Sequence, residues 1–109
     1  MNAPKLDEVW LVGLDPTQGA EIQKTRPCLV VSPDEMNRHL RTVIVAPMTT
    51  VRRSYPTRVD LVFEGKPGQV ALDQLRAVDQ QRFLRRTGVV NSKTALAVSR
   101  VLVEMFRRE

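Results

Sequence analysis

The sequence predicts a β-rich α+β fold, in which a small, strongly curved sheet or barrel carries one short helix and one C-terminal helix. The 109 residues suit a single domain over residues 1–109. Hydrophobic residues make up 42% of the chain but aromatic residues only 5%, so the core consists mainly of Val, Leu, Ile and Met. β-Branched residues favour strands. Roughly five to seven short apolar runs precede one long helical pattern, as in small barrels.

The first predicted strands are continuous apolar runs. Residues 8–14 and residues 28–32 form two of them. Residues 42–48 form the third, and we expect Pro47 and the polar residues after it to stop this strand.

The later strands show more varied patterns. Residues 57–63 alternate between apolar and polar side chains, which is typical of a half-buried strand. The EGKPG segment, residues 64–68, predicts a turn that leads into a strand over residues 68–72. Residues 75–78 and 83–90 are predicted to form a further strand and an irregular connection.

Two helices are predicted from cap signals and periodicity. In SPDEMNRHL, Ser32 is expected to be the N-cap, with Pro33 at the first helical position and Glu35 completing a capping box. The C-terminal SKTALAVSRVLVEMFRRE has apolar residues at helical spacing, with Ser92 as its expected N-cap. We expect this second helix to cover one opening of the sheet.

The basic excess lies in the second half of the chain. The net charge is +5 at pH 7; residues 1–50 carry five basic and six acidic side chains, and residues 51–109 carry twelve and six. Thirteen of the seventeen basic residues are Arg, whose planar guanidinium suits phosphate. Charge alone leaves two interpretations equally open, a solvated basic surface and a face that binds nucleic acid.

Several classes of protein do not fit the composition. Cys28 is the only cysteine, so an intrachain disulfide is excluded, and its apolar surroundings predict a buried thiol. His39 is the only histidine, which excludes two-histidine RNA cleavage and, with a single Cys, a zinc cluster; we predict no metal and no cofactor. No signal peptide and no run of about 20 apolar residues is found. We expect a cytoplasmic protein with no membrane association.

The segment DPTQGAEIQKTRP, residues 15–27, is too long for an ordinary hairpin connection. Such connections need about two to five residues, and longer loops in small domains are usually functional or disordered. Arg26 at its end is held extended by Pro27, and Thr49 and Thr50 follow the third strand. If both strand ends open onto one edge, a guanidinium and a hydroxyl meet, which suits a phosphodiester in its extra-negative transition state.

Each of these residues also has a structural interpretation. Arg26 taken alone would more often form a salt bridge, with Glu21 or Asp15, and Thr49 would more often cap a turn.

Several segments together resemble the MazF/PemK/Kid family of toxin–antitoxin ribonucleases. These are EVWLVGLDPTQGAEIQKTRPCLVVSPDEMN, TVIVAPMTT, YPTRV and GQVALDQLRAVD, which follow one another from Glu8 to Val78. The resemblance implies an SH3-like barrel capped by helices and a homodimer with composite grooves. It also implies metal-independent, sequence-specific cleavage of single-stranded RNA (mRNA), which inhibits translation and growth, and a MazE-like antitoxin with an acidic tail.

The resemblance also implies a catalytic pair, Arg26 and Thr49. Cleavage would use the ribose 2′-hydroxyl and leave a 2′,3′-cyclic phosphate and a 5′-hydroxyl. Arginine stays protonated at neutral pH, so we expect Arg26 to stabilise the transition-state oxyanion and to protonate the leaving group, while Thr49 orients the phosphate. The base stays open, with Glu21 as a candidate.

The sequence departs from one branch of the family, which has an Arg and a His where this chain has Ala71 and Ala20. An acid–base scheme built on those two side chains therefore does not transfer. For Asp73 we favour a structural role over a catalytic one.

We expect the RNA to be held by polar and aromatic side chains around the catalytic pair. Tyr55 offers a ring on which an unpaired base can stack; the alternative is that its loop is a mobile, solvated hairpin. The substrate-binding candidates are Lys24, Thr50, Arg52, Arg53, Tyr55, Gln74 and Arg76. Two other functions stay open, a CcdB-like gyrase poison and a non-catalytic RNA- or protein-binding barrel.

Overall fold

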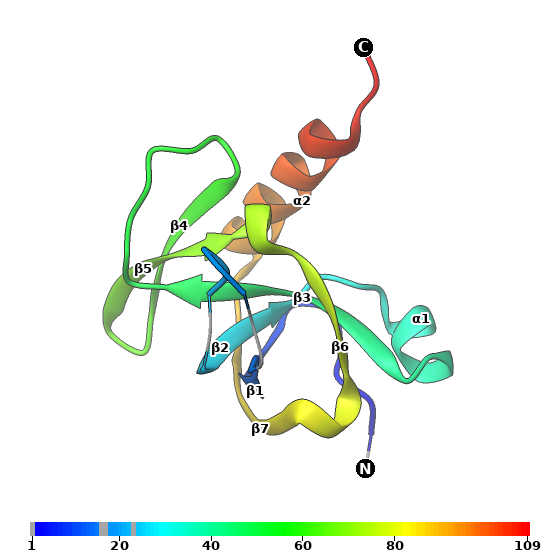
Figure 1. Cartoon of the computed structure of the whole chain (residues 1–109). Coiled ribbons are helices and arrows are strands. Elements are labelled where there is room, and N and C mark those ends of the chain that lie inside the picture. Colours follow the sequence, from blue (N-terminus) through cyan, green and yellow to red (C-terminus); the bar gives the residue numbers. More distant parts are fainter. Residues whose placement is uncertain (1, 16–17, 23) are drawn as a thin grey trace.

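The computed structural model describes residues 2–15, 18–22 and 24–109, and their strands curl into a half-barrel (Figure 1). The elements are β1 (Glu8–Gly13), β2 (Thr25–Val30), α1 (Asp34–His39), β3 (Thr42–Thr49), β4 (Arg58–Phe63), β5 (Lys66–Ala71), the 3-10 turn η1 (Leu72–Gln74), β6 (Arg76–Asp79), the 3-10 turn η2 (Gln80–Arg82), β7 (Phe83–Val89) and α2 (Ser92–Phe106). The predicted β-rich α+β class, with a short helix and a C-terminal helix, is confirmed.

The described strands form one antiparallel sheet in the order β4-β5-β3-β2-β1-β7. The long strand β3 lies at its centre and changes partner on one side. Its first half pairs with β6, and its last two residues pair with β5. This change of partner bends the sheet, because the β4–β5 hairpin and β6 leave β3 in different directions (Figure 1).

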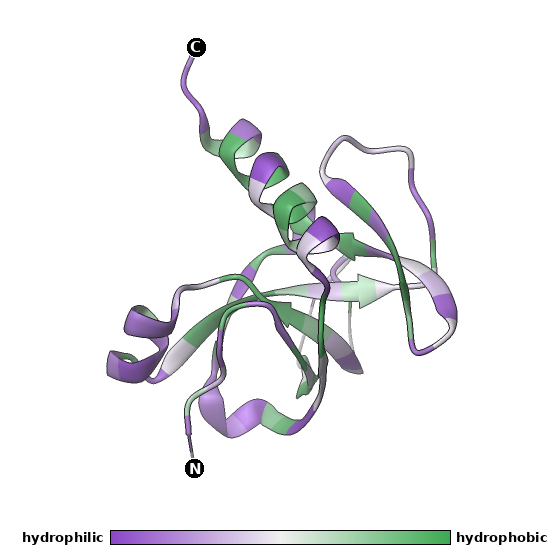
Figure 2. Cartoon of the chain, turned by 180° about the vertical axis from the view of Figure 1, so that it is seen from behind, coloured by the Kyte–Doolittle hydropathy of each residue, from purple (hydrophilic) through white to green (hydrophobic). Residues whose placement is uncertain are grey.

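Two apolar clusters pack on the two faces of the curled sheet. The interior cluster consists of Trp10, Val12, Leu14, Cys28, Val30, Val43, Val45, Val78 and Phe83. The second cluster lies under α2 and includes Val9, Leu29, Ala46, Met48, Val59, Val70, Leu72 and Val98. Ala97, Val98, Val101, Leu102 and Met105 of α2 pack into this second cluster, and Figure 2 shows the apolar bands along the helix. The helix packs against β4 and η1 on one face of the sheet, and that it covers an opening stays a prediction.

Two strand predictions are wrong. Pro47 does not stop the third strand, since β3 continues to Thr49. Pro47 pairs with Cys28 of β2 and lies where β3 passes from β6 to β5 on its other side, so its missing N–H falls at a change of partner. Residues 83–90 are not an irregular connection, because β7 pairs with β1 through two register shifts.

The predicted EGKPG turn is shorter than expected. The connection between β4 and β5 consists of Glu64 and Gly65, and β5 already begins at Lys66. Both turn residues have positive φ, 51° and 78°, as two-residue hairpins of the type I′ class require.

Both predicted helix caps are wrong by one residue or more. The helix α1 starts at Asp34 with Pro33 as N-cap, and the Ser32 hydroxyl instead donates to Asn37 Oδ1 at 2.5 Å. Asn91 caps α2, since its side-chain oxygen accepts from Thr94 N at 2.9 Å. Ser32 is buried, and a buried hydroxyl needs a hydrogen-bond partner; Ser32 finds it in the Asn37 side chain rather than in the helix N-terminus. None of the helices in the described part of the chain is long and apolar enough to cross a membrane.

Candidate active site

The register of β2 and β3 brings Arg26 and Thr49 together. The β2–β3 pairing ends at Cys28 and Pro47, and its register, continued by two residues, points Arg26 towards Thr49. Both residues line the same two grooves. Both side chains are half-buried. The structure therefore brings the two residues to the same grooves, and their catalytic roles stay a prediction.

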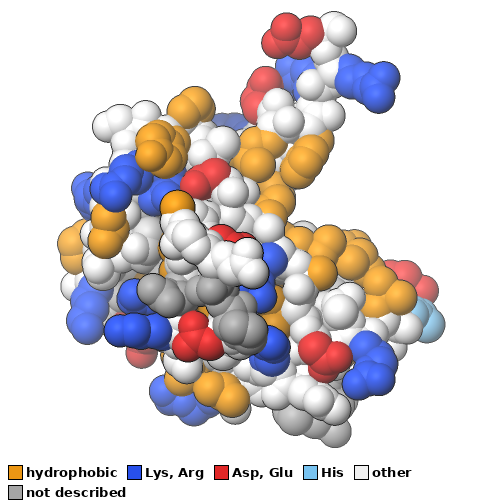
Figure 3. Space-filling view, in the orientation of Figure 1, with side chains coloured by type: hydrophobic (Ala, Val, Ile, Leu, Met, Phe, Trp, Pro, Cys, Tyr) orange, Lys and Arg blue, Asp and Glu red, His pale blue; other side chains and the backbone are white. Residues whose placement is uncertain are grey.

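Two adjoining grooves share this pair. The first, which we call the polar groove, has a volume of about 470 Å³ and is lined by Ala20, Glu21, Ile22, Arg26, Thr49, Val51, Arg53, Tyr55, Arg58, Asp73 and Gln74. The second, the apolar groove, measures about 450 Å³ and includes Met48, Leu61, Phe63, Lys66 and Pro67 beside Arg26, Thr49 and Thr50. Lys and Arg side chains gather over the β3–β4 connection and the β4–β5 hairpin (Figure 3).

The close approach of β5 to Thr49 depends on a glycine. A Cβ at Gly68 would come within 2.7 Å of the Thr49 carbonyl oxygen. The Thr49 hydroxyl accepts a hydrogen bond from Val51 N at 3.1 Å. Thr49 thus caps a turn, as its structural interpretation expects, and its hydroxyl hydrogen can still be donated to a ligand.

The segment between β1 and β2 forms one side of the polar groove, and we call its described residues 18–22 and 24 the loop rim. Pro16, Thr17 and Gln23 lie outside the described residues. Leu14 N donates to Lys24 O at 3.0 Å and Lys24 N to Asp15 Oδ1 at 2.9 Å, which closes the base of the loop. Lys24 lies in the left-handed region with φ 70°.

The predicted base candidate lies within the loop rim. Gln18 N donates to Glu21 Oε1 at 2.6 Å, and Glu21 N donates to Gln18 O at 3.2 Å. This reciprocal pair fixes the turn and brings the exposed Glu21 into the lining of the polar groove with Arg26 and Thr49.

Two predicted substrate-binding residues bond to the loop backbone. Gln74 Oε1 accepts from Ile22 N at 2.9 Å, and its amide nitrogen donates to Ala20 O at 3.4 Å. Arg76 Nη1 donates to Leu14 O at 3.1 Å and lines a smaller adjoining pocket. Gln74 thus anchors the loop rim and Arg76 the start of the β1–β2 connection, and a role in RNA binding stays a prediction for both.

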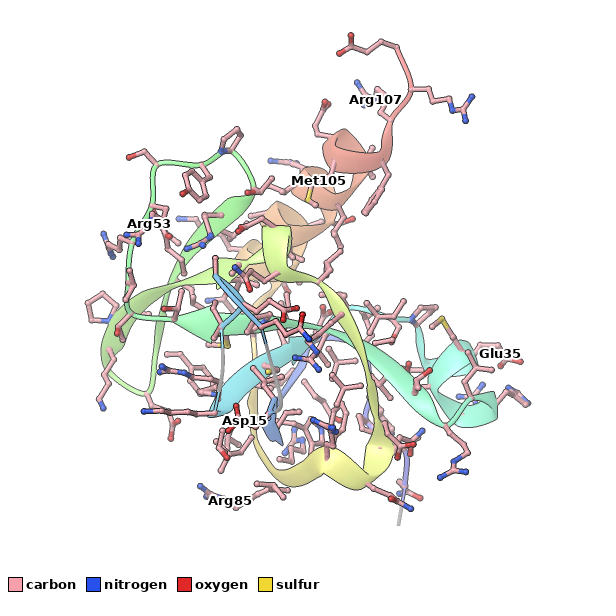
Figure 4. All side chains as sticks on the ribbon, viewed as in Figure 1. Asp15, Glu35, Arg53, Arg85, Met105 and Arg107 are labelled. Carbon is pink, nitrogen blue, oxygen red and sulfur yellow. The ribbon has the colours of Figure 1, made fainter. Side chains whose placement is uncertain are left out.

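The opposite side of the polar groove is the connection between β3 and β4, residues 51–57, which we call the strand rim. It carries the predicted contacts Arg52, Arg53 and Tyr55, all exposed, and Figure 4 shows Arg53 on this connection. Gln69 is buried beneath the strand rim and forms two hydrogen bonds with the backbone of Arg53. Arg53 N donates to Gln69 Oε1 at 3.0 Å, and Gln69 Nε2 donates to Arg53 O at 3.1 Å.

Asp73 and Arg58 form an ion pair between the two rims. Arg58 Nε donates to Asp73 Oδ1 at 2.7 Å and Nη2 to Oδ2 at 3.3 Å, while Thr57 Oγ1 donates to Oδ1 at 3.1 Å. Burial alone would raise the pKa of Asp73, but the hydrogen bonds from Arg58, from its own backbone amide and from Thr57 lower it below the ordinary value. Asp73 is therefore ionised at neutral pH.

Arg58 and Gln69 are site residues that no local sequence pattern indicates. The alternation over residues 57–63 assigns Arg58 to the solvent face, and nothing local shows that Gln69 of β5 and Asp73 of η1 lie beside it. The register pairs Arg58 with Ala71, the position where one branch of the resembling family has an Arg.

The functional groups at the site are guanidinium, hydroxyl and carboxylate groups. Among the residues that the structure describes, no three His, Cys, Asp or Glu side chains lie close enough together to hold a metal ion. Cys28 is not a nucleophile, because burial raises the pKa of its thiol to about 12.

The structure is a half-barrel that carries an arginine and a strand-end hydroxyl in a groove with a basic rim, and such donors suit a phosphodiester. Comparison with known proteins gives the particular family. The chain belongs to the PemK-like, MazF-like toxins of type II toxin–antitoxin systems, whose family model matches residues 5–106. The resemblance found in the sequence motifs is confirmed.

Relatives with known names agree with this family. Endoribonuclease PemK of Escherichia coli is 39% identical over 79 residues, which are 68% of this chain and 59% of PemK. Endoribonuclease MazF of Staphylococcus epidermidis is 30% identical over 104 residues, covering 84% of this chain and 87% of that protein. The match therefore spans less than two thirds of PemK but most of the staphylococcal MazF.

Solved structures share the fold along nearly the whole chain. MazF from Deinococcus radiodurans superposes with a TM-score of 0.83 at 25% identity, covering 94% of this chain and 96% of that one. A mycobacterial endoribonuclease in complex with its cognate antitoxin gives 0.81 at 24% identity, covering 98% and 100%. The half-barrel with its two helices is thus a MazF-like fold.

Proposed function

We propose that this chain is an endoribonuclease toxin that cleaves single-stranded RNA at short sequences and so inhibits translation and growth. The observation that carries the proposal is that Arg26 and Thr49, at the adjoining ends of β2 and β3, line the same two grooves. Relatives that bear the name endoribonuclease support it, as does the arginine-rich net charge of +5.

The proposed reaction is an internal transfer of the phosphoryl group. The ribose 2′-oxygen forms a bond to phosphorus, and the bond from phosphorus to the 5′-oxygen breaks. The proton of the 2′-hydroxyl passes to a base, and the departing 5′-oxygen receives a proton from an acid. The products are a 2′,3′-cyclic phosphate and a 5′-hydroxyl, and no water or metal ion is consumed.

Arg26 and Thr49 act on the phosphate in this reaction. Charge on the non-bridging oxygens rises in the pentacoordinate state, and donors already in place stabilise that state more than the ground state. In this proposal Arg26 supplies the positive charge and the forked donors, and it protonates the leaving oxygen. Thr49 donates its hydroxyl hydrogen and orients the phosphate.

We assign the base to Glu21 rather than to Asp73. Both carboxylates line the polar groove. Both oxygens of Asp73 accept from Arg58, and its lowered pKa makes it a weak acceptor of a further proton. Gln18 N bonds to Oε1 of Glu21, and a carboxylate has further lone pairs for the 2′-hydroxyl.

The partners follow from the same surface. We propose that a MazE-like antitoxin with an acidic tail competes with RNA for the basic groove, and that the toxin acts as a homodimer. A related mycobacterial endoribonuclease is described in complex with its cognate antitoxin. Charge complementarity between an acidic tail and the strand rim supports the first part.

Incubation of the purified protein with a long RNA in EDTA tests the function. We expect fragments with 5′-hydroxyl ends, and Arg26→Ala should lower kcat by about 10²-fold or more, because it removes a charged donor to the transition state. Arg85→Ala, on the exposed side of β7, is the matched control and should cleave normally. Strict metal dependence, or full activity of Arg26→Ala, would contradict the mechanism. Gyrase trapping, or RNA binding that leaves the strand intact, would contradict the function.

A further inference from the structure

We propose that Arg58 is a positioning residue that sets the distance between the strand rim and the scissile phosphate, and thereby determines where RNA is cut. The inference rests on the proposed cleavage of RNA. It assigns no direct contact with the reacting atoms to Arg58, and it follows from three sets of contacts made by this one side chain.

The first set of contacts ties Arg58 to the floor of the polar groove. Its side chain is only 7% exposed, whereas that of Asp73 is 26% exposed. Two parallel N–H···O bonds join the two groups, at 2.7 and 3.3 Å. A forked pair of this kind fixes the plane of the guanidinium as well as its place. A Lys at this position would keep the charge but not the fork.

The second set of contacts ties the same guanidinium to the strand rim. Arg58 Nη1 donates to Val51 O at 3.5 Å and to Gln69 Oε1 at 3.3 Å. Its Cζ lies 5.2 Å from the centre of the Tyr55 ring, in the range of a cation–π contact. Arg58 therefore holds the beginning and the middle of the strand rim while it is anchored to Asp73.

The third set of contacts extends this control to Arg53. Gln69, which is bonded to Arg58, also bonds to both the N–H and the carbonyl of Arg53 and donates to Asp60 Oδ1 at 2.9 Å. In the sheet Gln69 pairs with Thr49 on one side and with Asp60 on the other. The backbone of Arg53 is thus connected to the strand position that carries Thr49.

The consequence concerns the spacing between a base and a phosphate of the RNA. The Tyr55 residue remains 49% exposed although Arg58 lies over its ring, so an unpaired base can stack on the ring. Arg26 and Thr49 hold the scissile phosphate. Since Arg58 fixes Tyr55 relative to this pair, it fixes which phosphate along the strand reaches them. The occupant of the strand rim is therefore an unpaired base near the cut.

The variant Arg58→Lys tests this role with Arg86→Lys as its control. Arg86 Nε donates to Glu8 Oε2 at the same distance of 2.7 Å, away from both grooves. We expect Arg58→Lys to lower kcat/KM at the preferred site by about tenfold, since small misplacements are costly, and to raise the share of cuts at secondary sites. Arg86→Lys should keep the wild-type cleavage pattern.

Two further readouts separate positioning from general stability. The Arg53 amide, which donates to Gln69, should exchange its hydrogen faster in Arg58→Lys than in the wild type. Tyr55→Leu removes the exposed ring but not the ion pair, so it should relax the choice of cut site and leave the exchange of the Arg53 amide unchanged. Both variants are conservative enough to fold, which thermal unfolding checks.

The outcomes decide the two proposals separately. An unchanged choice of cut site in Arg58→Lys, or a loss of activity that parallels a loss of folded protein, would overturn the positioning role. A wild-type protein that leaves RNA intact would overturn the proposed function instead. The exchange of the Arg53 amide would then decide whether Arg58 fixes the strand rim, because that measurement does not depend on cleavage.

Discussion

The two rims of the polar groove are held by the same kind of side chain in different surroundings. Gln69 bonds to the backbone of Arg53 on the strand rim, and Gln74 bonds to the backbone of Ile22 and Ala20 on the loop rim. In each case the side-chain amide accepts from one backbone N–H and donates to one backbone carbonyl, as a neighbouring strand would. The two glutamines are only five positions apart, one in β5 and the other in η1.

The difference between the rims lies in what supports each amide. Gln69 is 6% exposed and is itself bonded to Arg58 and Asp60. Gln74 is half-buried, and the contacts of its amide go to the loop backbone. A buried network orders its members more strongly than a single partly solvated bond. We infer that the strand rim is the fixed side of the groove and the loop rim, which carries Glu21, the adjustable side.

The largest expected effect is that of Gln69→Ala. The substitution leaves the Arg53 amide and the Arg58 Nη1 without their bonds to Gln69 in a buried place, and we expect the free energy of unfolding to fall by about 3 kcal/mol. Chemical denaturation measures this loss. Gln81→Ala, at an exposed position, should change the free energy by less than about 0.5 kcal/mol. A loss for Gln69→Ala as small as this control would remove the basis for calling the strand rim fixed.

The ion pair beneath the strand rim should appear in the pH dependence of stability. The pKa of Asp73 is lowered in the folded protein, so its contribution to stability is fully present above its unfolded value of about 3.9 and is lost as the pH falls through the folded value. We expect the wild type to lose stability below about pH 5. Asp73→Asn should be less stable at pH 7 and should show a flatter profile in acid.

Other acidic groups contribute to the same profile, so the difference between the two proteins is the informative quantity. The pKa of Glu8 is also lowered: burial opposes this, but hydrogen bonds from Lys5, Trp10 and Arg86 prevail. Burial raises the pKa of Asp7, which therefore acts with the opposite sign. Both are present in wild type and variant and cancel in the difference. Parallel profiles for the two proteins would show that the Asp73 ion pair adds no stability.

The sequence predicted the parts of this site that depend on one strand end at a time. Arg26 is held extended by the following proline and Thr49 closes an apolar strand, so both are visible as local patterns. Their meeting needed only the assumption that neighbouring strands open onto one edge, and the register of β2 and β3 agrees with it. The C-terminal helix was equally predictable, because its periodicity is local.

The support beneath the strand rim could not be predicted in this way. Arg58, Gln69 and Asp73 come from β4, β5 and η1, and their contacts depend on sheet register and on a two-residue turn at Gly65. A shift of the register by one residue would turn Arg58 to the opposite face. The misplaced cap at Ser32 also depends on packing, since its buried hydroxyl bonds to Asn37. Asn91, which caps the C-terminal helix, is a local signal that the prediction missed.

The smallest expected effect is that of Gln74→Ala on the loop rim. It removes one partly solvated pair of hydrogen bonds, so we expect a loss of about 1 kcal/mol in the free energy of unfolding and faster hydrogen exchange of the Ile22 amide. If Gln74 also contacts RNA, as the sequence predicts, the KM for RNA should rise even where the exchange of the Ile22 amide is unchanged. Hydrogen exchange is measured at Ile22 because its amide donates to Gln74 at 2.9 Å, whereas the bond from Gln74 to Ala20 O is longer, at 3.4 Å. A loss as large as that of Gln69→Ala would show that both rims are equally fixed. Unchanged exchange at Ile22 together with a raised KM would instead make Gln74 a direct substrate contact rather than a support of the loop rim.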